Sequence, residues 1–293
     1  MAVELNPTVI RVAVSDLLGK DVTRRELAPP RSPAEVGRRL EDVVVEESGR
    51  IPVPLRAVAV SVAKPVDPRT LDVIELPDTP YPEGLVQPAR LLADRVDAPL
   101  LVDNDANLAA LGEQHIGVAK DVRNFAYVYV GAGIGGGIVV DGQLVRGSRG
   151  LAGEFGYLPS RADATAERHG LARAVAALGL GPRRRDAWYA DPITDARALL
   201  TAAEQGDGQA LAAVAAAGLA LGEAATALTA VIDPEILVLG GPVGIHPLLL
   251  ARVQDTLDEL APAPTKVVAG ALGETAPLQG ALELARRHAR ANL

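Results

Sequence analysis

Cysteine is absent from this sequence of 293 residues, and aromatic residues make up only 3% of it. The lack of cysteine excludes disulfide bonds, thiolate catalysis and any zinc site with cysteine ligands. The four histidines are far apart along the chain, which argues against a histidine metal site; they are His115, His169, His246 and His288. We therefore expect no bound metal, and a core built from Ala, Val and Leu.

Positive charge is also scarce, since 29 Lys and Arg face 37 Asp and Glu and the net charge is -8. A basic face that would drive nucleic-acid binding is not evident. The short basic clusters 183–185 and 286–288 lie in helical patterns and indicate solvated helix faces. The N-terminus carries no apolar signal region, and no apolar run reaches membrane-spanning length once its glycines and charges are counted. We expect a cytoplasmic protein that binds neither nucleic acid nor membrane.

Strands and helices alternate in the first part of the chain. Ser32-Pro33-Ala34-Glu35 is typical of a capping box with proline at the first helical position. Such alternation predicts a largely parallel sheet of an α/β protein. The expected strands cover 9–14, 57–62 and 99–102, and the expected helices cover 33–48 and 89–96.

The second part of the chain combines a hairpin with long alanine-rich helices. Asp141-Gly142 is a type I′ hairpin signal between antiparallel strands. Further strands are expected at 125–130, 236–239 and 266–268, and helices at 107–113, 195–205, 208–230, 247–260 and 277–291. The length suits two α/β domains. We predict one domain from 1–107 plus 277–293 and another from 108–276, with a hinge near 102–108.

Asn104 and Asp105 directly follow a predicted strand, where open α/β sheets bind ligands. An amide beside a carboxylate suits vicinal hydroxyls, and the carboxylate can take a proton from one of them. The alternative is that either residue simply caps the following helix. The local residues alone favour the cap.

Three glycine-containing segments are similarly ambiguous. Backbone N–H groups of 131–137 could converge on an anion, but a glycine-rich hairpin turn has the same pattern. Gly240-Gly241 is either a tight turn or a nucleotide contact. The segment 153–157 places Glu154 and Tyr157 where they could bind a sugar, and it could equally be an ordinary exposed loop.

The order and spacing of these segments resemble the ROK family of repressors, open reading frames and sugar kinases. The matching motifs are Asp-Asn-Asp-Ala-Asn-x-x-Ala-x-Gly-Glu at 103–113, Val-Gly-Ala-Gly-Ile-Gly-Gly-Gly-Ile at 130–138, Asp-Gly-Gln-Leu-Val-Arg-Gly at 141–147, Gly-Leu-Ala-Gly-Glu-Phe-Gly at 150–156 and Pro-Glu-Ile-Leu-Val-Leu-Gly-Gly at 234–241. The likeness covers nearly the whole chain. It implies an α/β, two-lobed, actin-like and ribonuclease-H-like ATPase fold with a sugar in the cleft between the lobes.

The resemblance assigns roles to individual residues. It implies that Asp105 corresponds to the catalytic base of the family's kinases. The implied sugar-binding residues are Asn104, Asp105, Glu154, Tyr157 and, across a gap in the alignment, Glu167. The implied nucleotide-binding or phosphate-loop residues, vestigial or weak in this chain, are Gly131, Gly133, Gly135, Gly240 and Gly241.

The chain departs from the family pattern at four places. The Asp-x-Gly-Gly-Thr phosphate loop is replaced by Glu-Leu-Asn-Pro-Thr at 4–8, and Pro7 lacks an N–H that a phosphate would need. The segment 61–67 replaces a Gly-x-Pro-Gly turn. Tyr157 replaces a histidine that binds zinc and sugar, and the cysteine-rich zinc loop is missing. We predict that the protein binds no zinc, and that it uses ATP with Mg²⁺ only if it is a kinase.

A changed phosphate loop beside a retained sugar site is typical of the family's transcriptional regulators. We therefore expect a sugar-sensing effector domain without kinase activity and without the winged helix-turn-helix that such regulators carry. One alternative is an ATP-dependent, glucokinase-like sugar kinase with Asp105 as its base. A further alternative is a degenerate structural or dimerisation module. In each case we expect a homodimer.

Overall fold

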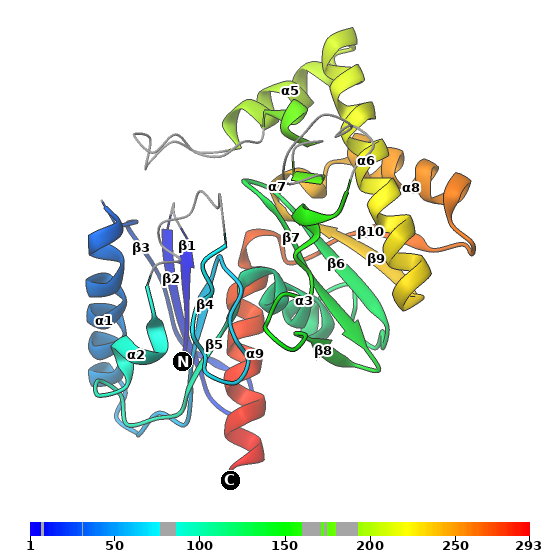
Figure 1. Ribbon diagram of the computed structural model, residues 1–293. Coiled ribbons are helices and arrows are strands. Elements are labelled where there is room, and N and C mark those ends of the chain that lie inside the picture. The colour runs from blue at the N-terminus through cyan, green and yellow to red at the C-terminus, as the bar shows by residue number, and fades with distance from the viewer. Residues whose placement is uncertain (7–8, 31, 77–85, 160–170, 173–174, 180–192) are drawn as a thin grey trace.

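The computed structural model describes residues 1–6, 9–30, 32–76, 86–159, 171–172, 175–179 and 193–293. Two five-stranded sheets lie beside each other, each with helices on its faces (Figure 1). Helices α3 (Asp105–Ile116) and α9 (Ala276–Ala291) lie between the sheets. The predicted α/β class with two lobes is confirmed.

The first sheet has the strand order β3-β2-β1-β4-β5. Its strands are β1 (Ala2–Asn6), β2 (Val9–Ser15), β3 (Asp21–Leu27), β4 (Val58–Val62) and β5 (Leu100–Asn104). Helices α1 (Pro33–Arg50) and α2 (Pro88–Leu92) cover one face, where Val36 and Leu40 pack on the valines of the strands. Leu278 and Ala281 of α9 cover the alanines of the opposite face. Burial on both faces explains why β1, β2, β4 and β5 are rich in apolar residues, whereas the edge strand β3 is mostly polar and more exposed.

The N-terminal segment corrects one expectation. The first strand was expected at residue 9, but β1 begins at Ala2 and is central, antiparallel to β2 and parallel to β4. Glu4 in the middle of the strand interrupts the apolar run, and Arg11 of β2 neutralises its charge. The sheet is therefore mixed.

The prediction of a capping box at the start of α1 is also wrong, because the Ser32 side chain makes no capping hydrogen bond.

The second sheet has the strand order β10-β9-β6-β7-β8. Its strands are β6 (Phe125–Val130), β7 (Ile134–Val140), β8 (Gln143–Val145), β9 (Ile236–Gly240) and β10 (Lys266–Ala269). Helices α6 (Gly208–Ile232) and α8 (Pro247–Leu260) cover one face, and α3 lies on the other. The shorter helices α5 (Thr194–Glu204) and α7 (Gly241–Gly244) lie at one end of this lobe.

Helix α6 corrects the expectation that no apolar run reaches membrane-spanning length. By length and composition it could cross a membrane, but half of its most apolar stretch is buried within the protein. Ala217, Leu221 and Leu228 belong to the same apolar core as strands β6 and β9. We interpret α6 as a core helix, because its buried side packs on the sheet and on α8.

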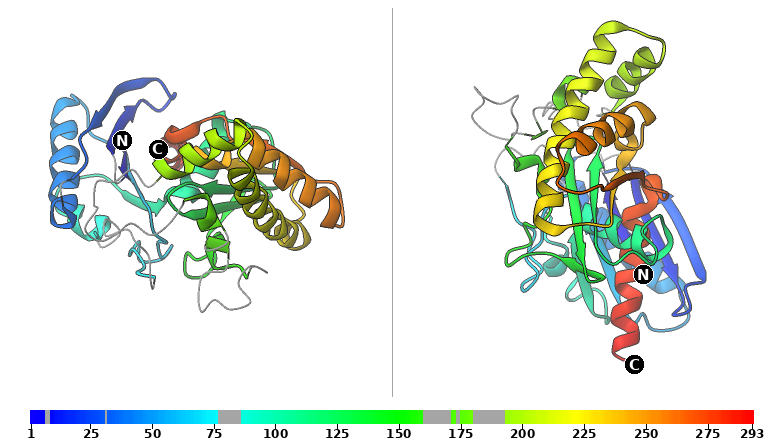
Figure 2. Two further views of the ribbon diagram at one scale, coloured as in Figure 1. Left: turned by 90° about the horizontal axis from the view of Figure 1, so that it is seen from above. Right: turned by 90° about the vertical axis from the view of Figure 1, so that its right-hand side faces the viewer.

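Helices α3 and α9 pack on each other between the two sheets in Figure 1, and the right-hand view of Figure 2 shows α9 (red, ending at C) beside the blue strands of the first sheet. Gly280 of α9 lies so close to α3 that a Cβ atom there would overlap the carbonyl oxygen of Leu108. A Cβ atom on Gly112 of α3 would lie 2.6 Å from the carbonyl oxygen of Ala276. The predicted domain boundaries at 107/108 and 276/277 fall in the first turns of these helices, and they stay a prediction.

Replacing Gly280 with alanine should destabilise the protein, because the added methyl group forces α9 away from α3. We expect the free energy of unfolding to fall by about 2 kcal/mol or more, as for other overpacked cores. Gly49→Ala is the matched control, since that glycine lies in α1 with open space around it. This control should be neutral or stabilising by up to about 1 kcal/mol. Equal effects of the two substitutions in denaturant unfolding would contradict the packing argument.

Candidate functional site

Asn104 and Asp105 lie where β5 ends and α3 begins. The Oδ1 atom of Asn104 accepts hydrogen bonds from the backbone N–H groups of Ala106 at 2.9 Å and Asn107 at 3.2 Å. Asn104 is thus the helix cap, as its local sequence suggested, and the cap makes no use of its Nδ2 donor. Asp105 is the first helical residue, and its Oδ1 atom also accepts from Ala106, at 2.7 Å. The capping geometry therefore fixes both side chains at the helix start.

Glu4 is a carboxylate near Asp105 that the sequence analysis missed. It is only 2% exposed, and Arg11 Nη1 lies 3.1 Å from its Oε1 atom. Burial raises the pKa of Glu4 to about 7, against the opposing effect of Arg11, and the negative charge of Asp105 raises it further. The sequence segment that replaces the family's phosphate loop thus still begins with an acid, which lies in β1 and senses the charge of Asp105. The signal was present, because Glu4 stands where the family pattern has aspartate.

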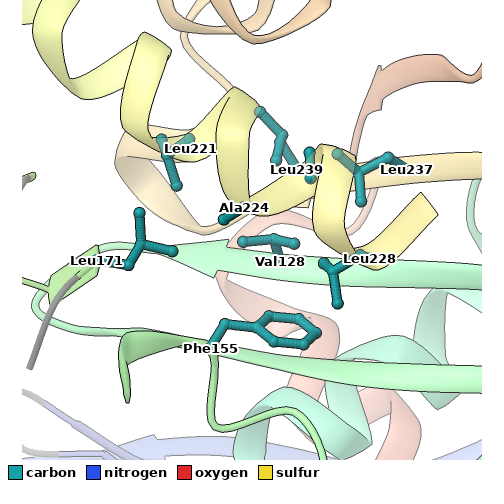
Figure 3. Close-up of a pocket in the computed structure, with 9 residues that line it drawn as sticks. Val128, Phe155, Leu171, Leu221, Ala224, Leu228, Leu237 and Leu239 are labelled. Carbon is teal, nitrogen blue, oxygen red and sulfur yellow. The ribbon is translucent and has the colours of Figure 1, made fainter. Parts of the chain in front are cut away.

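Glu154 approaches Asp105 from the other lobe. Burial and, second, the charge of Asp105 raise the pKa of Glu154 to about 7. The next residue, Phe155, is buried and directs its ring into an apolar pocket with Val128 and Leu228 (Figure 3). The 3₁₀ turn Phe155–Tyr157 follows directly. Phe155 therefore anchors the loop that presents Glu154.

The glycine-rich segment is mostly a strand and not a loop, which corrects the expectation for 131–137. Only 131–133 form a turn, while Gly135 and the next two glycines belong to β7. A Cβ atom on Gly137 would lie 2.6 Å from Ala110 of α3. A Cβ atom on Gly153 would overlap the carbonyl oxygen of Gly136. The bare strand lets both α3 and the Glu154 loop approach it, which brings Asp105 and Glu154 together.

The remaining predicted glycines lie at one end of the second sheet. Strands β6 and β9 are parallel with Tyr129 opposite Gly240, so the turns that follow them are neighbours. The N–H of Gly131 donates to the Gly133 carbonyl at 3.0 Å, and Gly241 has a positive φ of 78°. Burial raises the pKa of the Tyr127 hydroxyl beside these turns, and the charges of Glu113 and Asp105 raise it further. The Tyr127 hydroxyl packs so closely on Gly240 that a Cβ atom there would overlap it.

For the last two predicted sugar-binding residues, Tyr157 and Glu167, the structure gives little support. Tyr157 is 41% exposed at the end of its turn. Glu167 lies outside the described residues. Among the residues that the structure describes, no three His, Asp or Glu side chains gather where they could hold a metal ion. The absence of zinc stays a prediction.

Glu4 has a carboxylate oxygen that suits a magnesium ion. The Oε2 atom of Glu4 is buried without a hydrogen-bond partner among the described residues. Such a carboxylate oxygen is the kind of ligand that Mg²⁺ or its bound water prefers. Glu4 therefore offers one buried carboxylate oxygen beside Asp105 to which a metal ion could bind.

Several curated proteins of known activity are similar to this chain. The bifunctional enzyme NanE/NanK of Brucella suis is 34% identical over 221 residues, which are 75% of this chain and 39% of that protein. The chain thus spans about two fifths of that relative. N-acetylmannosamine kinase of Salmonella newport is 30% identical over 297 aligned residues, covering 98% of both proteins.

Solved structures agree on the fold. The ROK hexokinase of Thermus thermophilus is 26% identical with a TM-score of 0.77, covering 99% of this chain and 98% of that one. A ROK glucokinase from Streptomyces griseus, solved with glucose and AMPPNP, is 24% identical with a TM-score of 0.75 over 97% and 98% of the chains. A ROK transcriptional regulator homologous to the E. coli MLC protein is 20% identical with a TM-score of 0.76, and the match covers 98% of this chain and 78% of that one. The predicted actin-like, two-lobed fold is confirmed.

These relatives correct the expectation of a sugar-sensing regulator domain without kinase activity. An N-acetylmannosamine kinase that is 30% identical covers 98% of this chain and a glucokinase is 32% identical over 52% of it, whereas the regulator is 20% identical and shows the fold alone. Physically, that expectation gave too much weight to the altered loop at 4–8, which retains its acid in Glu4. The family model of the ROK family matches residues 1–288, and the chain belongs to the ROK family.

Proposed function

We propose that this protein transfers a phosphoryl group from ATP to a hydroxyl group of a sugar, with Asp105 as the general base. The observation that carries the proposal is the position of Asp105 at the start of α3. There its charge raises the pKa of both Glu4 and Glu154. The proposal is supported by relatives that are named kinases.

The chemistry follows from the side chains. Asn104 and Glu154 would hydrogen-bond the sugar hydroxyls and orient one of them toward Asp105. Asp105 would accept the proton of that hydroxyl as its oxygen forms a bond to the γ-phosphorus. The bond from that phosphorus to the β–γ bridging oxygen breaks, and ADP leaves. Glu4 would hold the magnesium that neutralises charge on the transferred group.

The substrate class follows from the relatives, whose names include N-acetylmannosamine kinase and glucokinase. Hexoses and N-acylated hexosamines are therefore the candidates. Gly131, Gly133, Gly240 and Gly241 are the proposed nucleotide contacts, and Tyr157 is a proposed sugar contact. Use of ATP agrees with a cytoplasmic location, and the homodimer remains a proposal.

Asp105→Asn should abolish sugar phosphorylation while leaving the fold intact, because the amide keeps the shape of the side chain but cannot accept the proton. We expect kcat to fall by about 10² to 10⁴ fold, the usual contribution of a general base. The measurement is ADP release with ATP, Mg²⁺ and a panel of hexoses and N-acylated hexosamines. Glu259→Gln, an exposed position on α8, is the control. Absence of phosphorylation by the unaltered protein across the panel would refute the proposed function.

Glu154 should make the stability of the protein depend on pH. In the folded protein its pKa is raised from 4.5 to about 7, so between these values the folded state binds more protons than the unfolded state. The contribution of Glu154 to the free energy of unfolding is therefore fully present below about pH 4.5 and is lost as pH rises through about 7.

Glu154→Gln removes this titration. The fall in unfolding free energy between pH 5 and 8 should shrink by about 1–3 kcal/mol, the scale of a raised pKa in a partly buried group. Denaturant unfolding at both pH values measures the difference, with Glu259→Gln as an exposed comparison. An unaltered pH dependence would show that burial and the charge of Asp105 do not raise the pKa of Glu154.

A further inference from the structure

Asp103 is a buried acid beside the proposed catalytic residue, and the function proposed above does not use it. It lies in β5 and is 3% exposed. Its Oδ1 atom accepts the N–H of Asn104 at 2.9 Å and the side-chain Nδ2 of Asn107 at 3.0 Å. These two bonds enclose the segment that carries Asp105. Asp103 therefore holds the first turn of α3 through Asn104 and Asn107, the residues on either side of Asp105 and Ala106.

The other oxygen of Asp103 pairs with a residue of the second lobe. Oδ2 accepts Arg146 Nε at 2.8 Å and lies 2.7 Å from Arg146 Nη2. Arg146 follows β8, and its carbonyl oxygen accepts the N–H of Ala152 at 3.2 Å. That bond closes the loop that leads through Gly153 to Glu154. Arg146 thus contacts the Asp105 segment through its side chain and the Glu154 loop through its backbone.

We propose that Asp103 and Arg146 are positioning residues that set the place of Asp105 relative to Glu154 and thereby the affinity for the sugar. The inference rests on the proposed function. Neither residue needs to touch the substrate, because each holds a segment that does. Their ion pair joins β5 to the chain segment that leads to Glu154.

The burial of Asp103, whose side chain is 4% exposed beside an Arg146 side chain that is 31% exposed, makes the pair sensitive to substitution. Removing Arg146 leaves the Asp103 carboxylate buried without its cation, and a buried charge that loses its partner distorts or hydrates its surroundings. The ion pair of Arg123 with Asp141 provides a contrast in the same lobe. Its N–O distance is 3.4 Å and its side chains are 71% and 77% exposed. Such an exposed pair contributes little.

Steady-state kinetics on the full chain test the proposal first. We expect Arg146→Ala to raise KM for the sugar by about tenfold and to leave KM for ATP within about twofold, since only the sugar side is displaced. Arg146→Lys should recover part of the affinity, because lysine restores the positive charge but offers one nitrogen where arginine contacts Asp103 through both Nε and Nη2. Asp103→Asn in the Arg146→Ala background should also recover part, because it removes the unpaired charge. Arg123→Ala should behave as the unaltered protein. Equal rises in both KM values, or no recovery in either variant, would overturn the proposal.

Hydrogen exchange on the same proteins gives a test that needs no catalysis. Arg146→Ala should speed exchange by about tenfold both at Ala106 and Asn107 and at Tyr157 and Leu158, whose amides are hydrogen-bonded in the two segments. Faster exchange confined to the loop at 147–153, or equal acceleration everywhere, would overturn the coupling. If the unaltered protein phosphorylates no sugar, the proposed function fails, and the exchange pattern still decides whether the pair positions both segments.

Discussion

The contact between α3 and α9 is the constraint on which the two-lobed arrangement depends. Leu108 and Gly280 approach so closely that no side chain fits between the helices. Each helix also connects the lobes: α3 begins at the end of β5 and packs on β7, and α9 follows β10 and packs on β1 and β4. Because α3 begins with Asp105, the same packing that joins the lobes also places the proposed base. Glu113, buried near the other end of α3, accepts the N–H of Leu272 at 2.9 Å and so fixes the chain that enters α9.

Buried charge connects this junction to the candidate site. Arg11 contacts Glu4 at 3.1 Å and reaches Glu274, next to the start of α9, at 3.2 Å. One guanidinium therefore neutralises a site carboxylate and holds the chain entering α9 against the first sheet. Asp103 plays a comparable part on the opposite side, where Arg146 of the second lobe neutralises it. Glu4 and Asp103 thus each pair with an arginine. An uncompensated buried charge would be costly.

Much of the fold could be predicted because apolar runs and their terminators are local signals. The strands near 9–14, 57–62 and 125–130 and the long helices appear close to their predicted limits. Asn104 and Asp105 were identified together with both of their possible roles, and the cap proved to be one of them. The errors share a cause. The charged Glu4 made β1 look unlike a buried strand, and the glycines of β7 suggested a loop. In both places a residue distant in sequence favours the strand: Arg11 pairs with Glu4, and α3 packs on the glycines of β7.

The sequence by itself determined the α/β class, the family resemblance and the residues at the start of α3, since these depend on local pattern and on motif order. Only the tertiary structure decided that Glu4 lies near Asp105, that Glu154 shares its electrostatic environment, and that Asp103 pairs with Arg146. These relations join residues more than forty positions apart, and no local pattern encodes them. They arise because α3, α9 and the bare strand β7 bring the two lobes into contact, and packing of that kind is a property of the folded chain.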